Sequence, residues 1–211
     1  MSTEHRPCAP DSVHRDTLLQ RFDALLEPAR FRDYGPNGLQ VEGRATVRRI
    51  VSGVTASRAL IEAAIANDAD AIFVHHGLFW RGQDGRVNGW LKQRLALLLA
   101  HDINLYAYHL PLDAHPTLGN NAQLAARLGW EAQARFGEQE LGFLGRWAAD
   151  RAPMNATALV RHIESTLNRP CSSVMASEDA IEKLAWCSGG AQGYFEAAIA
   201  AGAQVFVTGE M

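Results

Sequence analysis

A short, unbroken apolar run at residues 71–74 is followed directly by His75 and His76. Its branched and aromatic side chains are typical of a buried strand in a parallel sheet. In open α/β sheets, ligands bind beyond the carboxyl ends of the strands, which is where this pair lies. Because neighbouring strand residues point to opposite faces, both imidazoles can reach one place only if the chain leaves strand geometry there, which Gly77 makes sterically easy. The pair alone fits a metal or catalytic site and two unrelated histidines about equally well.

Apolar runs and helical periodicity alternate on both sides of this strand. We predict a helix over 12–26, a strand over 49–54, a helix from the Ser57 cap to Ala66, a helix over 90–100 and a strand over 103–108. Strand, helix, strand, helix, strand at this spacing predicts βαβ units with right-handed crossovers.

The second half of the chain carries another set of elements. We predict a helix over 120–128 that ends at Gly129, a strand over 141–147, a helix over 156–167, strands over 173–175 and 183–187, an Ala-rich helix to Ala201 and a strand over 204–208. The polar segment 131–140 has little pattern, so we place a boundary there, between domains 1–130 and 131–211. The predicted fold class is α/β, with two lobes of βαβ units and mostly parallel sheets.

Composition excludes several classes of protein. The formal charge of −3 and the absence of a Lys/Arg cluster give no sign of nucleic-acid binding. Three widely spaced cysteines, Cys8, Cys171 and Cys187, argue against a disulfide framework and a thiolate zinc site. No apolar run approaches the length of a membrane span, and residues 1–10 resemble a frayed leader rather than a signal peptide. We therefore expect a cytoplasmic protein without a membrane partner.

A second group of metal-binding side chains, His109, Asp113 and His115, follows the strand predicted over 103–108. Adjacent ends of parallel strands lie near one another, so His75, His76, His109 and Asp113 could share one rim. Imidazole with carboxylate suits zinc, manganese, iron, cobalt or nickel better than calcium or magnesium. We give His109 and His115 the role of orienting the ligands, and for His115 the reading of a plain surface histidine is favoured.

Two glycine-containing segments have competing interpretations. Residues 33–43 combine Gly-Pro and Asn-Gly and read best as a plain connecting loop. In the segment 188–193, Ser188, Gly190 and Gly193 occupy the positions of a G-x-G-x-x-G motif whose first glycine is missing, and Glu210 follows about twenty residues later. The turn from Gly189 and Gly190 to Gly193 thus indicates either an anion site or close packing of a helix on a strand.

Seven short motifs, at residues 34–43, 53–57, 75–80, 109–116, 119–121, 188–191 and 208–210, together resemble the YbgI-like dinuclear metal centre family, whose members are named GTP cyclohydrolase I type 2-like. The resemblance implies a two-lobed α/β protomer that assembles into a toroidal hexamer, with two divalent transition-metal ions between the lobes. By motif match it implies His75, His76 and Asp113 as metal ligands, with Asp113 as the bridge.

Members of that family continue past the Gly-Glu motif into a helix that supplies a further histidine and glutamate to the metals, whereas this sequence stops at Met211. The resemblance therefore predicts that the second lobe lacks this segment. It also predicts poor cover over Val205, Phe206 and Val207, lower stability and at least tenfold weaker binding of the second ion, which corresponds to about 1.4 kcal/mol.

The leading functional hypothesis is a metal-dependent hydrolase that uses metal-activated water on a nucleotide or another small polar substrate. The alternative is a non-catalytic metal-binding oligomeric scaffold or adaptor, because the sequence shows no evident general acid or base beside the ligands. Dinucleotide binding at Gly190 and Gly193 is a weaker third hypothesis. The sequence names neither the substrate nor the metal.

Overall fold

The computed structural model describes residues 12–210, so the predicted leader over 1–10 lies outside the described residues. The chain divides into two compact units, Met1–Pro111 and Leu112–Met211. This division lies earlier than the boundary predicted between residues 130 and 131. The reason is that α5 (Asn120–Leu128), which the sequence assigned to the first domain, packs against β7 (Trp130–Phe136) and α6 (Ala156–Leu167) of the second unit.

The first unit contains, in chain order, β1 (Val13–His14), α1 (Arg15–Leu26), the 3-10 helix η1 (Pro28–Arg30), β2 (Gly38–Val41), β3 (Thr46–Val47), β4 (Ile50–Thr55), α2 (Arg58–Ala66), β5 (Ala71–His76), α3 (Gly89–Ala100) and β6 (Asn104–Ala107). The short helix α4 (Leu110–Ala114) contains the division between the units. Ser57 caps α2 as predicted, because its side chain accepts a hydrogen bond from the Leu60 N–H.

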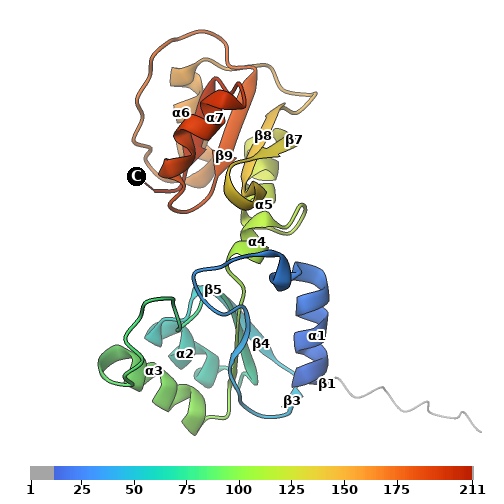
Figure 1. The fold of residues 1–211 in the computed structure, drawn as a ribbon, viewed down its shortest axis with the longest axis vertical. Helices are drawn as coiled ribbons and strands as arrows, with labels where there is room; N and C mark the ends of the chain where they lie inside the picture. Colours follow the sequence, from blue (N-terminus) through green and yellow to red (C-terminus); the bar gives the residue numbers. More distant parts are fainter. Residues whose placement is uncertain (1–11, 211) are drawn as a thin grey trace, which may run out of the picture. The chain divides into compact units, whose positions relative to one another are not determined.

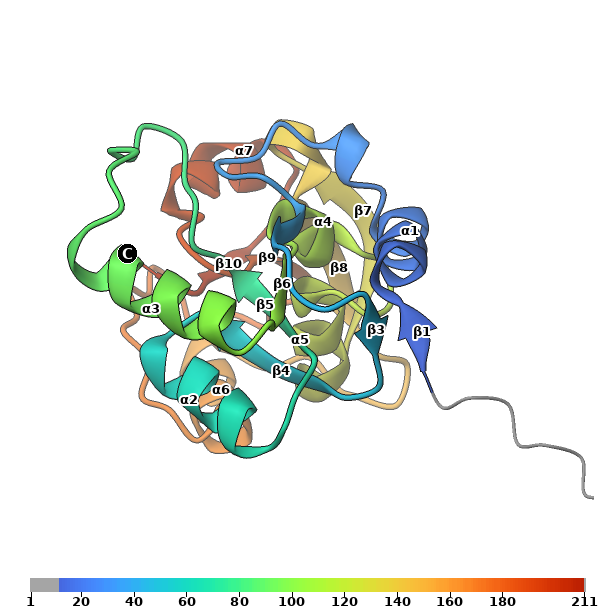
Figure 2. The ribbon, with the colours of Figure 1, turned by 90° about the horizontal axis from the view of Figure 1, so that it is seen from below.

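Four strands of this unit form a sheet in the order β2-β6-β5-β4, in which β4, β5 and β6 are parallel and β2 is antiparallel to β6. Helices α2 and α3 cover one face and α1 covers the other (Figure 1), as the view from below also shows (Figure 2). Ile72 and Val74 belong to the core under α2 and α3, whereas Phe73 contacts Phe22 of α1, with ring centroids 4.9 Å apart. The predicted βαβ units are confirmed here, but the segment predicted as a plain loop contains β2.

The second unit contains α5, β7, the 3-10 helix η2 (Glu138–Glu140), β8 (Gly142–Trp147), α6, β9 (Lys183–Cys187), the 3-10 helix η3 (Gln192–Tyr194), α7 (Phe195–Ala200) and β10 (Val205–Thr208). Its sheet has the order β10-β9-β8-β7, in which only β10 and β9 are parallel. The prediction of mostly parallel sheets is therefore wrong for this unit. The connection between β7 and β8 is short, and a short connection joins antiparallel strands, whereas parallel strands need a long crossover.

Two further differences from the sequence-based prediction lie in this unit. The polar segment 131–140 contains most of β7, which the pattern missed because its central residues are exposed on both faces. The strand predicted over 173–175 is absent from the structure, where these residues have no regular conformation and Val174 is 95% exposed. A short apolar run does not form a strand without a neighbouring strand to pair with.

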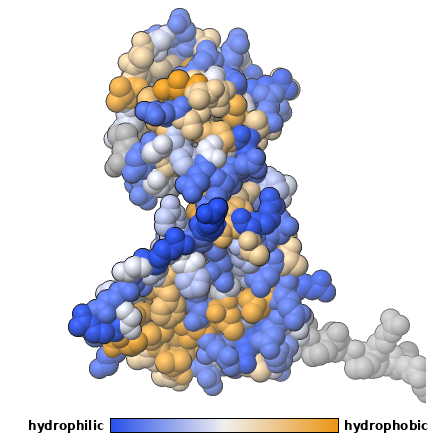
Figure 3. Space-filling model, in the orientation of Figure 1, coloured by the Kyte–Doolittle hydropathy of each residue, from blue (hydrophilic) through white to orange (hydrophobic). Residues whose placement is uncertain are grey.

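Apolar side chains also reach the surface of the described chain. Phe195 and Ile199 of α7 are 59% and 57% exposed, whereas Val205, Phe206 and Val207 of β10 are each partly buried. Figure 3 shows apolar residues at the surface among hydrophilic ones. Among the residues that the structure describes, no helix combines the length and apolarity needed to cross a bilayer.

Candidate metal centre

Three histidines of the first unit, His75, His76 and His109, form a cluster near the carboxyl ends of β5 and β6. The ring centroid of His75 lies 4.5 Å from that of His76 and 4.8 Å from that of His109. One ring nitrogen of each histidine lies within 4.8 Å of those of the other two, which is the arrangement expected of ligands that can share a metal ion. The structure thus brings the predicted pair together and adds His109, for which we predicted only a supporting role from the sequence.

The two adjacent histidines meet without the break in the strand that the sequence predicted. β5 continues through His76, which is paired with Thr55 of β4. Gly77 follows the strand and serves close packing: a Cβ atom there would collide with the side chain of Gln40, whose Oε1 accepts a hydrogen bond from the Leu78 N–H at 2.8 Å. Gly77 is therefore needed because β2 approaches closely at the end of β5.

Each imidazole is oriented by a protein group at its Nδ1 atom. His75 Nδ1 donates to the Tyr108 carbonyl at 3.2 Å, and His109 Nδ1 donates to Asp33 Oδ1 at 2.7 Å. His76 Nδ1 lies 3.2 Å from Thr55 Oγ1. In a neutral imidazole whose Nδ1 carries the proton, Nε2 carries the lone pair, and metal-binding histidines have this kind of partner at the other nitrogen.

Asp33 is the central residue that sequence reasoning missed at this site. Its side chain is only 3% exposed, and the carboxylate accepts hydrogen bonds from the Tyr34 N–H, His109 Nδ1, Asn37 Nδ2 and the Leu110 N–H, at 2.6 to 2.9 Å. Burial raises the pKa of Asp33, but the hydrogen bonds from His109, Asn37 and Leu110 outweigh burial and lower it. In the sequence, Asp33 stands at the start of a turn-rich segment, and an aspartate at such a position is equally common in an ordinary loop.

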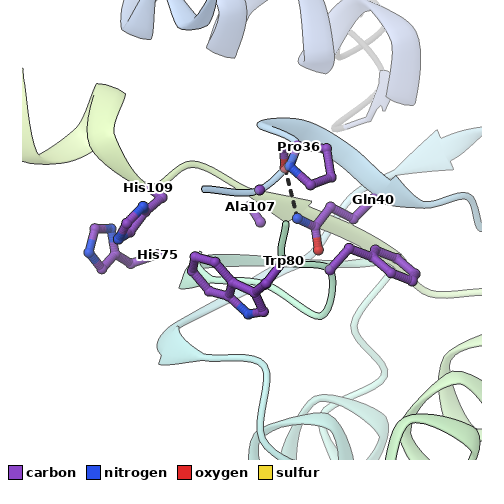
Figure 4. A pocket seen from close by; sticks show the side chains of 9 residues that line it. Pro36, Gln40, His75, Trp80, Ala107 and His109 are labelled. Carbon is purple, nitrogen blue, oxygen red and sulfur yellow. Dashed lines mark hydrogen bonds between the residues drawn. The ribbon is translucent and has the colours of Figure 1, made fainter. Parts of the chain in front are cut away.

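A shallow recess, open to solvent and lined by His75, Trp80 and His109 among other residues of the first unit, adjoins the histidine cluster. Figure 4 shows the imidazoles of His75 and His109 side by side, with the indole of Trp80 close to them. The Trp80 ring meets the His109 ring edge to face, with centroids 5.2 Å apart and an interplanar angle of 88°. The cluster therefore has an apolar wall on one side, which lowers the local polarity around the ring nitrogens.

Asp113, the third ligand predicted by resemblance, belongs to the second unit, where α4 carries it. The residue is 9% exposed, and its Oδ1 atom accepts hydrogen bonds from Asn120 Nδ2 at 2.8 Å and Ser188 Oγ at 3.1 Å. The nearby His115 stabilises a turn, because its Nδ1 accepts a hydrogen bond from the Leu118 N–H at 3.0 Å.

The glycine-containing turn after β9 has structural roles in the second unit. Gly189 has a φ angle of 71°, and its carbonyl accepts a hydrogen bond from Thr208 Oγ1 of β10 at 3.0 Å. The turn leads into the 3-10 helix η3 at Gln192 and then, without a gap, into α7 at Phe195. The helical N-terminus that follows the turn is therefore that of η3, and the anion site stays a prediction.

Comparisons with known proteins agree with this architecture. The family model DUF34/NIF3 (NGG1p interacting factor 3) matches residues 13–211. Proteins named "GTP cyclohydrolase 1 type 2 homolog" from Neisseria meningitidis serogroup A and Pseudomonas aeruginosa are 53% and 50% identical. The matches cover 94% and 95% of this chain and 79% of each relative.

Two solved structures have the same fold. Protein ybgI, described as of unknown function, has a TM-score of 0.88 and 44% identity, and the match covers 94% of this chain and 79% of that one. The Thermus thermophilus protein TTHA1606 has a TM-score of 0.80 and 33% identity over 94% of this chain and 78% of that one. From the family model and these relatives together, the chain belongs to the DUF34/NIF3 family.

Proposed function

We propose that this protein is a metal-dependent hydrolase that acts on a nucleotide or another small polar substrate, with His75, His76 and Asp113 as metal ligands. The observation that carries the proposal is the histidine cluster, in which three imidazoles offer ring nitrogens within 4.8 Å of one another. The name of these relatives, GTP cyclohydrolase 1 type 2 homolog, supports a nucleotide substrate. The resemblance leads us to propose two divalent ions per chain and a hexamer in the cytoplasm.

The chemistry of the side chains fits a divalent transition metal. Imidazole nitrogen and carboxylate oxygen are ligands that zinc, manganese, iron, cobalt and nickel accept. The hydrogen bonds at Nδ1 of His75 and His109 fix the tautomer in which Nε2 carries the lone pair. When bound, such an ion polarises the group under attack and lowers the pKa of a water molecule.

The proposed ligands are His75, His76 and Asp113, which leaves His109 to form an acid-base pair with Asp33 that the sequence alone did not reveal. The buried carboxylate of Asp33 holds the proton at His109 Nδ1, so that Nε2 is the basic atom. If Nε2 takes up a proton, the same carboxylate stabilises the resulting positive charge. This pair favours an enzyme over a non-catalytic scaffold, because the scaffold hypothesis rested on the apparent lack of an acid or base.

Metal analysis of protein purified without chelator tests the proposal. We expect at least one transition-metal ion per chain, loss of metal in His76→Ala and wild-type metal content in His101→Ala, an exposed histidine of the same unit. Hydrolysis of a panel of nucleotides with manganese, zinc or cobalt then tests the activity, which Asp113→Ala should abolish while circular dichroism stays unchanged. Metal binding without turnover on any nucleotide or other small polar ester or amide would support the scaffold instead.

A further inference from the structure

We propose that Asn120 and Ser188 are positioning residues for Asp113, which hold its Oδ1 atom and thereby present Oδ2 to a divalent metal ion. This inference rests on the proposed function, because Asp113 is a metal ligand only there. It gives a role to two sequence motifs, residues 119–121 and 188–191, that the histidine cluster does not involve.

The first observation is that both donors meet at the same carboxylate oxygen. Asn120 Nδ2 donates to Oδ1 at 2.8 Å and Ser188 Oγ donates to it at 3.1 Å. These two hydrogen bonds use the lone pairs of Oδ1, so coordination of a metal by that oxygen would have to break at least one of them. A metal ion that binds Asp113 through Oδ2 leaves both bonds in place.

The second observation is that one buried residue, Asn121, ties Ser188 to the backbone of Asp113. Asn121 is fully buried, and its Oδ1 accepts a hydrogen bond from the Ser188 N–H at 2.6 Å. The Asn121 carbonyl accepts a hydrogen bond from Trp186 Nε1 at 3.0 Å, and Asn121 Nδ2 donates to the Asp113 carbonyl at 3.3 Å. The end of β9 and the start of α5 are therefore tied to the backbone of Asp113, as a rigid support for a ligand requires.

The third observation concerns Gly119, the residue before α5. A Cβ atom at Gly119 would collide with the carbonyl of Leu112 and would lie 2.6 Å from the carbonyl oxygen of His115. The glycine thus lets the start of α5 approach the backbone around Asp113 closely enough for Asn120 to reach the carboxylate. The motifs at residues 109–116 and 119–121 thus meet the motif at residues 188–191, which lies far away in the sequence, at this one carboxylate.

The test measures Co²⁺ binding by calorimetry and visible absorption on the full chain. We compare Asp113→Asn, Ser188→Ala, Asn120→Ala, the conservative Ser188→Thr and a control, Ser177→Ala. The control removes a hydroxyl that donates to an exposed carboxylate, Asp179, at 2.6 Å in the same unit. We expect Ser188→Ala and Asn120→Ala each to weaken Co²⁺ binding about tenfold and to change the cobalt spectrum, which is the usual size of such support effects. Ser188→Thr and Ser177→Ala should bind like the wild type.

The outcomes separate the two proposals. If Asp113→Asn binds Co²⁺ as the wild type does, Asp113 is not a ligand, and both the proposed ligand set and this inference are overturned. If Asp113→Asn weakens binding but Ser188→Ala and Asn120→Ala do not, only the positioning role is overturned. The melting temperatures of the metal-free variants provide the folding check. If Ser188→Ala weakens Co²⁺ binding without lowering the melting temperature, and Ser188→Thr binds Co²⁺ like the wild type, the effect is due to positioning and not to general stability.

Discussion

The substitution Asp33→Asn tests whether one buried carboxylate organises the histidine cluster. Each carboxylate oxygen accepts two hydrogen bonds: Oδ1 from the Tyr34 N–H and His109 Nδ1, and Oδ2 from Asn37 Nδ2 and the Leu110 N–H. Asparagine keeps the shape and one acceptor, but its NH₂ group must face two donors. Hydrogen bonds to a charged group contribute about 1.5–3 kcal/mol each, so the loss of two predicts destabilisation by about 3–6 kcal/mol. This is a large part of the 5–15 kcal/mol typical of a domain.

Urea unfolding at neutral pH measures this loss. Histidine NMR measures the tautomer of His109 and so reports whether the asparagine oxygen or its NH₂ group faces Nδ1. The matched control is Asp84→Asn, which removes an exposed carboxylate that accepts from Arg86 and should leave the unfolding midpoint unchanged. A loss below about 1 kcal/mol in Asp33→Asn would refute the reasoning that the carboxylate charge supports the cluster.

Asp33→Asn should also change how the stability of the protein depends on pH. Burial raises the pKa of Asp33, but the hydrogen bonds to it lower the pKa further, so that its folded value lies below the ordinary 3.8. A group with a depressed folded pKa contributes stability above its unfolded pKa and loses it as the pH falls through the folded value. The difference in free energy of unfolding between the wild type and Asp33→Asn should therefore become smaller below about pH 3.8. A difference that stays constant down to pH 2 would contradict this assignment.

Three further substitutions test the supports of the first unit. Asp70→Asn should lower the free energy of unfolding at neutral pH, and this loss should become smaller below about pH 3.8 in urea titrations. The reason is that burial raises the pKa of Asp70 but hydrogen bonds from two backbone N–H groups and the charge of Arg44 lower it further. Asn104→Leu should destabilise by about 2–5 kcal/mol in urea unfolding, since the fully buried amide hydrogen-bonds three backbone groups; a neutral result would show that packing compensates. Ser57→Ala should cost about 1 kcal/mol through loss of the bond from the Leu60 N–H, and an unchanged melting temperature would argue against the cap.

The sequence predicted the elements whose side chains follow a clear period. The helix over 156–167 and the strand over 183–187 match α6 and β9 residue for residue, because each buries an apolar stripe or face that appears in the sequence. It did not predict β7, where exposed residues hide the period, or β2, a four-residue strand inside a turn-rich segment. It also did not predict the antiparallel pairing of β7 and β8. Pairing direction depends on which strands become neighbours, and that is decided by contacts distant in sequence.

At the candidate site, the sequence by itself determined which residue types are available: adjacent histidines at a strand end, a third histidine after the next strand, and an aspartate four residues later. Only the tertiary structure placed Asp33 against His109 across 76 residues of chain, and Ser188 against Asp113 across 75. The physical reason is that a hydrogen bond requires heavy atoms within about 3 Å, a condition that chain folding meets and that no local pattern encodes. The sequence therefore determines which side chains are available at the candidate site, and the tertiary structure determines how they are placed and oriented.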